Sequence, residues 1–271
     1  MSQHKPLILV SNDDGIDAPG LYAAVKGASA LGTVVVSAPA HQQSGVGRGL
    51  QRGPDVGTTQ VTNRFEQFDK VERAQAVIGS PAQAVHVAIL GYLKGRMPDL
   101  VITGVNLGYN VGSGIPASGT VGAAQEAWSL FGIPALAVSS QTLDHFGDGS
   151  EIDWDACAEV VAHWGAFILE HGLPEQVALL NVNIPIGATL STTPMRRTIV
   201  SYECDWKYVD ANGGRISPAT DLRIIDNPHE ERFEPDSDIR AVRDGVISVS
   251  PLRAQLATRS AWDVFDRAIG H

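Results

Sequence analysis

Two adjacent aspartates, Asp13 and Asp14, follow a short apolar segment near the start of the chain. That segment, residues 7–11, carries four consecutive aliphatic side chains, which is typical of a strand buried on both faces. Neighbouring carboxylates repel each other unless they are solvated, protonated or bound to a cation. Gly15 comes next and allows the backbone to turn sharply. We therefore interpret the pair as a candidate cation site at the end of a strand.

Other oxygen-bearing side chains follow other strand-like segments. Ser44 lies in the loop after residues 33–38, and Asn106 and Asn110 follow residues 98–104. Ligands of an open parallel sheet bind beyond the carboxyl ends of its strands, so these residues are expected to share one rim. Carboxylate, hydroxyl and amide oxygens suit a hard divalent ion such as Mg²⁺ or Mn²⁺ and suit zinc poorly.

The segment Ser118 to Thr120 reads Ser-Gly-Thr and opens an Ala-rich helical pattern. Backbone N–H groups and hydroxyls at a helix N-terminus bind phosphate oxygens, where the helix dipole is positive. A metal ion beside such a site provides the minimum for hydrolysing a phosphate ester. Two plainer interpretations remain open: the hydroxyls also suit helix caps, and the two asparagines also suit bracing of a glycine-rich loop.

Composition excludes several classes of protein. A chain of 271 residues with 44% hydrophobic content is long enough for one large domain with a sizeable core. Its net charge of −10 argues against binding a nucleic-acid polymer. Cys157 and Cys204 are the two cysteines, and no signal peptide precedes the first strand, so we expect a cytoplasmic protein. No apolar run has membrane-spanning length, so no membrane partner is expected.

Strand-like and helix-like segments alternate, which predicts an α/β fold with a mostly parallel sheet covered by helices. Further predicted strands cover residues 133–139 and 178–185, and predicted helices cover residues 21–31, 80–93, 120–130 and 154–171. Residues 193–251 predict projecting hairpins, with a turn at 212–214, and a last helix is expected over 257–269. We divide the chain into an α/β catalytic domain, residues 1–190, and a C-terminal extension, residues 191–271.

Seven segments, in order along most of the chain, resemble the SurE family of survival-protein nucleotidases. They are "LVSNDDGIDAPG", "SAPAHQQSGVG", "GSPAQAVHVAI", "DLVITGVNLGYNVG", "SGTVGAAQEA", "LLNVNIP" and "DIRAVRDGVISVSPL". The resemblance implies a Rossmann-like, doubly wound α/β fold and a divalent-metal phosphatase that acts on nucleoside 5′- and 3′-monophosphates. It also implies homodimers or homotetramers built partly from swapped C-terminal segments.

Carried over position by position, the resemblance implies a metal set and a substrate set. One Mg²⁺ or Mn²⁺ ion per subunit would be held by Asp13, Asp14, Ser44 and Asn106. The phosphate would lie among Asn12, Asn110, Ser118, Gly119 and Thr120. Asp13 or Asp14 would accept the proton of the attacking water. The chain departs from the usual family pattern at Ser113, Gly114, Pro116 and Ala117.

Two alternative functions remain beside the nucleotidase. One is a broader phosphomonoesterase or exopolyphosphatase, because no residue singled out here recognises a base or a ribose. The other is a nucleotide-binding regulator with weak turnover. Sequence patterns of other phosphate-binding proteins and hydrolases are missing: GxxxxGK[ST] and GxSxG do not occur, and "GVGRGL" at residues 45–50 lacks the last glycine of GxGxxG.

Overall fold

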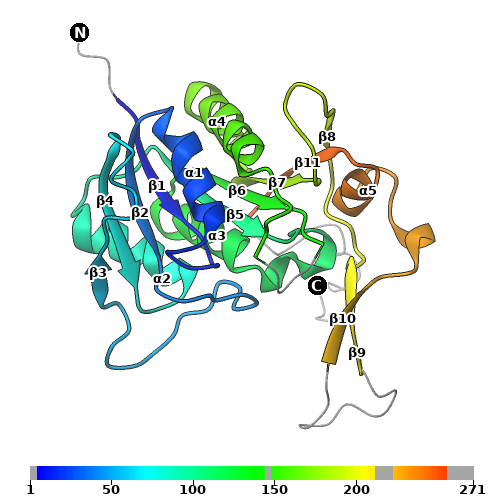
Figure 1. The fold of residues 1–271 in the computed structure, drawn as a ribbon, viewed down its shortest axis with the longest axis horizontal. Coiled ribbons are helices and arrows are strands. Elements are labelled where there is room, and N and C mark those ends of the chain that lie inside the picture. Colours follow the sequence, from blue (N-terminus) through cyan, green and yellow to red (C-terminus); the bar gives the residue numbers. More distant parts are fainter. Residues whose placement is uncertain (1–4, 144–147, 211–221, 255–271) are drawn as a thin grey trace, which may run out of the picture.

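The computed structural model describes residues 5–143, 148–210 and 222–254 (Figure 1). Their main feature is a nine-stranded sheet with the strand order β3-β4-β2-β1-β5-β6-β7-β11-β8. The strands are β1 (Leu7–Ser11), β2 (Thr33–Pro39), β3 (Thr59–Val61), β4 (Val71–Val77), β5 (Leu100–Leu107), β6 (Ala135–Ser140), β7 (Leu179–Ile184), β8 (Met195–Arg197) and β11 (Ile247–Leu252). The six strands from β4 to β7 in that order are parallel to their neighbours.

Helices cover both faces of this sheet (Figure 1). The helices are α1 (Pro19–Ser29), α2 (Pro81–His86), α3 (Gly119–Phe131), α4 (Trp154–His171) and α5 (Asp238–Arg243), with the π-helical turn η1 (Val87–Tyr92) and the 3₁₀ turns η2 (Gly112–Ala117) and η3 (Glu230–Arg232). Alternate side chains of β1 belong to two hydrophobic cores, one on each face of the sheet. Ile8 packs with α1 and α4, and Leu9 packs with α2 and α3. This two-sided burial confirms the predicted doubly wound α/β fold.

The C-terminal part adds strands both to the sheet and beside it. β11 pairs with β7 antiparallel. A strand from the C-terminal side of residue 190 therefore belongs to the main sheet. β9 (Trp206–Asp210) and β10 (Leu222–Asp226) form a separate antiparallel pair that projects from the body (Figure 1). The predicted turn at 212–214 and the predicted helix over 257–269 lie outside the described residues. The division of the chain at residue 190 stays a prediction.

Two parts of the fold differ in detail from the sequence prediction. Helical structure does extend from Pro81 through Tyr92, but its second half is the π-helical turn η1. β3 and β4 were not predicted, because β4 places charged residues such as Glu72 and Arg73 among its apolar ones. Within the described ranges, no helix is long and apolar enough to cross a bilayer.

β5 carries an irregularity at the point where it approaches the rim. Its pairing with β6 shifts register between Thr103 and Asn106, and Gly104 between them has a φ of +119°. A Cβ at Gly104 would lie 2.1 Å from the carbonyl oxygen of Val138 on β6. Bulges of this kind redirect side chains near functional sites. Here the irregularity precedes Asn106, one of the predicted metal ligands.

Helix α1 packs directly on this irregular segment, and we expect Gly20→Ala to destabilise the fold. A Cβ at Gly20 would lie 1.9 Å from the carbonyl oxygen of Val105. Overpacking of this kind costs about 1–3 kcal/mol or more. Gly91→Ala is the matched control, because the nearest atom to its added Cβ is a Val87 methyl at 4.0 Å. Thermal unfolding should show a clear loss for Gly20→Ala alone; equal melting temperatures would contradict the close packing.

Candidate metal centre and its phosphate loop

The turn after β1 is held by Asn12, whose side chain is fully buried. Its Nδ2 donates to the Gly15 carbonyl at 3.0 Å, and the Gly15 N–H donates to its Oδ1 at 3.3 Å. Gly15 has a φ of +101°, which favours glycine at this position. Asn12 therefore braces the turn that carries both aspartates. Its predicted part in phosphate binding stays a prediction, since both of its amide atoms are engaged here.

Asp13 lies against the N-terminus of α3 and is 3% exposed. The Thr120 hydroxyl donates to Asp13 Oδ1, and the Thr120 backbone N–H also bonds to this carboxylate. A Cβ at Gly119 would lie 2.7 Å from the Asp13 Cβ, so only glycine leaves room for this approach. Ser118 caps the helix, with its Oγ accepting from the Val121 N–H at 3.0 Å. The structure thus places Gly119 and Thr120 directly against Asp13, while Ser118 caps the helix beside them.

Asp14 is bound from two directions. Its Oδ2 accepts from the Leu107 N–H at 3.0 Å, at the end of β5. The Gln42 side chain also bonds to Asp14, and Gln42 Nε2 donates to Ser44 Oγ at 3.1 Å. Ser44 itself is exposed. Gln42 therefore links the Ser44 hydroxyl to the aspartate pair, a role that sequence analysis missed because a loop glutamine carries no distinctive pattern.

The two asparagines of the glycine-rich loop have different roles. Asn106 Nδ2 donates to the Gly108 carbonyl at 2.8 Å, while its Oδ1 has no hydrogen-bond partner among the described residues. Asn110 is held more fully: its Nδ2 donates to Ser139 Oγ at 2.9 Å, and its carbonyl accepts from Asn181 and Asn183. Both asparagines brace the loop, as the plainer interpretation expected. Asn106 nevertheless retains an amide oxygen for a ligand.

Burial makes the aspartate pair electrostatically unfavourable. It raises the pKa of Asp13 to about 7, with the charge of Asp14 adding to the effect and the Thr120 hydrogen bonds opposing it. Burial also raises the pKa of Asp14, against the hydrogen bonds from Leu107 and Gln42. No lysine, arginine or histidine in the described part of the chain forms an ion pair with either carboxylate. Among the described residues, these two adjacent carboxylates have no positive partner.

The chemistry of these side chains fits a divalent cation. Asp13 and Asp14 offer carboxylate oxygens, and Asn106 offers its unpaired amide oxygen. Among the described residues, no cluster of three or more histidine, cysteine, aspartate or glutamate side chains is placed to hold a metal ion. An ion at this rim therefore requires neutral oxygens beside the two carboxylates, as Mg²⁺ and Mn²⁺ accept.

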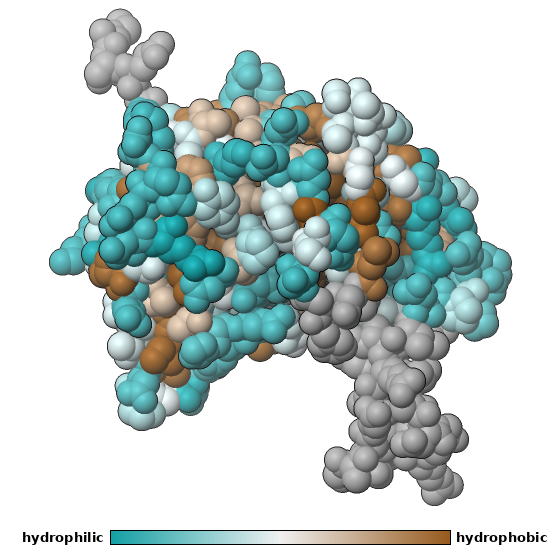
Figure 2. Space-filling model, viewed as in Figure 1, coloured by the Kyte–Doolittle hydropathy of each residue, from teal (hydrophilic) through white to brown (hydrophobic). Residues whose placement is uncertain are grey.

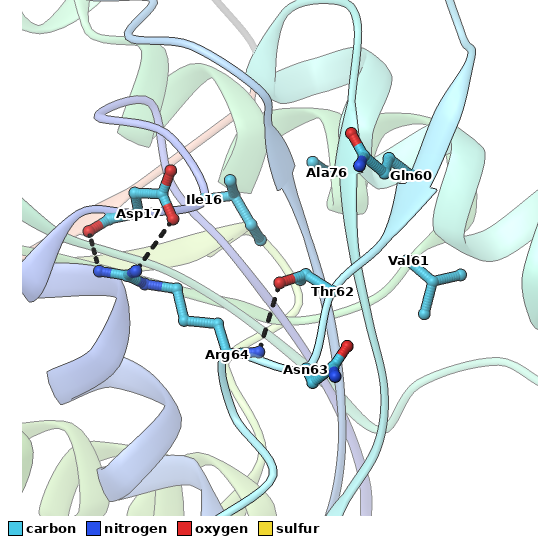
Figure 3. Close-up of a pocket in the computed structure, with 8 residues that line it drawn as sticks. All are labelled: Ile16, Asp17, Gln60, Val61, Thr62, Asn63, Arg64 and Ala76. Carbon is cyan, nitrogen blue, oxygen red and sulfur yellow. Dashed lines mark hydrogen bonds and ion pairs between the residues drawn. The ribbon is translucent and has the colours of Figure 1, made fainter.

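Two cavities flank this rim. One has a volume of about 490 Å³ (Figure 3). It is lined by Ile16 and Asp17, which directly follow the aspartate turn, and by residues of β3 and the loop after it. Arg64 spans its edge, with Nη1 3.1 Å from Asp17 Oδ1 and Nη2 donating to the Asp17 carbonyl at 2.9 Å (Figure 3). The other, of about 910 Å³, lies between the ends of β6 and β7 and α5, where Figure 2 shows apolar side chains gathered.

Comparison with known proteins places the chain in one family. The family model described as "Survival protein SurE" matches residues 8–208. A protein named 5′-nucleotidase SurE from Methanosarcina acetivorans is 36% identical over 277 residues, covering 97% of each chain. Another of that name, from Methanocella arvoryzae, is 35% identical over 266 residues and 92% of each chain.

A solved structure gives the same result. The crystal structure of the SurE protein from Aquifex aeolicus superimposes with a TM-score of 0.79 at 30% identity, covering 97% of this chain and 100% of that one. The match to the family model, over residues 8–208, includes the β1 turn, the Ser-Gly-Thr segment and the strands between them. The chain belongs to the SurE family.

Proposed function

We propose that this chain is a divalent-metal-dependent nucleotidase that hydrolyses nucleoside 5′- and 3′-monophosphates to a nucleoside and phosphate. The observation that carries the proposal is the buried Asp13–Asp14 pair, which has no cationic partner among the described residues and lies against a helix N-terminus. The names of its relatives support a nucleotidase, since several are 5′-nucleotidases. The proposal includes a homodimer or homotetramer in the cytoplasm, as the family resemblance implies.

Four residues are proposed to hold one Mg²⁺ or Mn²⁺ ion: Asp13, Asp14, Ser44 and Asn106. When bound, such an ion supplies Lewis-acid polarisation of a phosphate oxygen and lowers the pKa of a water molecule. The two aspartates contribute the negative charge, and Asn106 contributes the amide oxygen that no described donor occupies. Gln42 supports the set by hydrogen bonding to both Asp14 and Ser44.

The phosphate is proposed to bind at the N-terminus of α3. Ser118, Gly119 and Thr120 present hydroxyl and backbone N–H groups there, beside Asp13. Asn110 and Asn12 complete the set by fixing the two loops on either side of this segment. The helix N-terminus supplies the positive potential, so a phosphate binds without an arginine cluster in an acidic protein.

Asp13 and Asp14 are also the proposed proton acceptors for the attacking water. Burial raises the pKa of both carboxyls in the chain without an ion, and as carboxylates both can accept a proton. The Thr120 hydroxyl fixes the orientation of the Asp13 carboxylate, and the Leu107 N–H fixes that of Asp14. The water oxygen attacks phosphorus and the alkoxide leaves, with no phosphoaspartate formed.

The first prediction concerns turnover. The purified chain should release phosphate from AMP or GMP with Mn²⁺ or Mg²⁺, and EDTA should abolish the release. Asp13→Asn removes one charge and one base, so kcat should fall at least about 100-fold. Asp155→Asn is the control, because that carboxylate is 78% exposed and pairs with Lys26 on α1, away from the rim.

Three outcomes separate the functions. Nucleotide binding without phosphate release would favour the regulator, and faster turnover of polyphosphate or simple phosphomonoesters would favour the broader phosphatase. EDTA-insensitive turnover in a folded Asp13→Asn variant would contradict the metal mechanism. A panel of nucleoside 5′- and 3′-monophosphates, polyphosphate and p-nitrophenyl phosphate, run with each ion, covers all three.

The second prediction concerns stability without metal. The folded chain holds the Asp13 proton up to a pH of about 7, whereas the unfolded chain releases it near about pH 3.9. Wild-type stability from this group is therefore present at low pH and falls as the pH rises towards 7. Asp13→Asn stays neutral, so in EDTA its melting temperature relative to the wild type should be higher at pH 8 than at pH 5. Each kcal/mol corresponds to about 2–4 °C.

Adding Mn²⁺ at pH 8 should instead lower the melting temperature of Asp13→Asn relative to the wild type, because the ion stabilises the ionised pair of the wild type. Differential scanning calorimetry of both proteins at the two pH values, with EDTA or with Mn²⁺, gives the comparison. The electrostatic account fails if the difference in melting temperature between the two proteins is the same at pH 5 and pH 8 in EDTA.

A further inference from the structure

Residues 41–50, here called the Ser44 loop, are held at the rim by backbone hydrogen bonds and an ion pair, in addition to the bond between Gln42 and Asp14 described above. The Gln43 N–H donates to the Asp13 carbonyl at 2.7 Å, and the Gly47 N–H donates to the Ala117 carbonyl at 2.9 Å. Beyond these, Arg48 forms an ion pair with Glu126 through Nε. Ser44 lies between the first two attachments. Its place at the rim therefore depends on how the loop as a whole is held.

Glu126 is a buried acid that the proposed mechanism does not use. It lies on α3 and is 3% exposed. One carboxylate oxygen bonds to Arg48, and the other lies 2.5 Å from Nε2 of His86 on α2. Burial opposes ionisation, but the hydrogen bonds from His86 and Arg48 outweigh it and lower the pKa of Glu126. The carboxylate is thus ionised and aimed at the loop.

The loop also packs tightly on η2 and α3. A Cβ at Gly122 of α3 would lie 2.6 Å from the Gly47 carbonyl carbon, and a Cβ at Gly47 would lie 2.6 Å from the Pro116 carbonyl oxygen. Backbones that approach this closely have no side chains between them to fix their relative position. Directional contacts then help to fix their relative position, and the Arg48–Glu126 ion pair is one of them.

We propose that Glu126 is a positioning residue, which holds Arg48 and thereby fixes the Ser44 loop so that Ser44 stands beside the aspartate pair. Glu126 does not touch the substrate or the ion; it acts through Arg48. The part of this inference that concerns Ser44 as a metal ligand rests on the proposed function. The attachment of the loop does not, because the contacts of Arg48, Gly47 and Gln43 are made within the protein and involve no metal ion.

Arg48→Ala is the primary test, because the Arg48 side chain is 39% exposed and its loss leaves the core packing intact. Mn²⁺ binding to the full chain is measured by titration calorimetry, and hydrogen exchange of residues 41–51 by mass spectrometry. We expect Mn²⁺ affinity to fall about tenfold, as for other residues that orient metal ligands, together with faster exchange in the loop. With AMP, kcat should fall more than KM rises.

Further variants separate positioning from a general loss of stability. Arg48→Lys keeps the charge and should recover part of the Mn²⁺ affinity. Glu126→Gln should resemble Arg48→Ala, and the double variant should bind Mn²⁺ no more weakly than either single one, since both act through one contact. Glu72→Gln is the matched control: it breaks the 2.8 Å pair with Arg96 on the far side of α2 and should change neither Mn²⁺ affinity nor loop exchange.

Arg48→Ala with Mn²⁺ affinity within twofold of the wild type would overturn the inference, whether or not the loop exchanges faster. Unchanged exchange would overturn the attachment itself. A wild-type chain that neither binds Mn²⁺ nor releases phosphate would instead contradict the proposed function. Exchange in Arg48→Ala would then still decide whether Arg48 and Glu126 hold the loop.

Discussion

The burial of two like charges at the end of one strand is the constraint on which the rest of the site depends. Removing a carboxylate from water is costly unless hydrogen bonds or an opposite charge replace the solvent. Here the replacement comes from neutral donors: the Thr120 hydroxyl and N–H, the Leu107 N–H and the Gln42 amide. Neutral donors fix the direction of each carboxylate without cancelling its charge. The pair keeps an attraction for a cation that a neighbouring lysine or arginine would have removed.

The same arrangement bears on the proposed binding of a phosphate by an acidic protein. With a net charge of −10, the chain as a whole repels a phosphate monoester. Local backbone geometry opposes this, because the N-terminus of α3 presents N–H groups at the rim, and Gly119 lets that helix start directly against Asp13. The aspartates and the helix end thus form adjacent regions of opposite potential. A metal ion and a phosphate group require such neighbours.

Much of this was predictable from sequence, for a physical reason. β1 and β5 are buried on both faces and each begins with a run of apolar residues, so the polar residues that follow those runs stand out. β4 is only partly buried and has no such run. The contacts of Gln42 and Glu126 join residues from separate elements, and no local pattern marks them. Sequence thus predicts which residues reach the rim better than it predicts what holds them there.

The support of the rim is uneven, and this unevenness has a chemical meaning. Asp13, Asp14 and Asn106 stand at the ends of central strands, where the sheet and its two cores fix the backbone. Ser44 stands on a loop with no strand beneath it, joined to the rim by two backbone hydrogen bonds, the Gln42–Asp14 bond and one ion pair. A metal site needs its oxygens at fixed distances, and the least constrained oxygen limits how well all of them fit. The buried Glu126 lies where it compensates for that weakness, because through Arg48 it joins the loop to α3, the helix whose first turn already contacts Asp13.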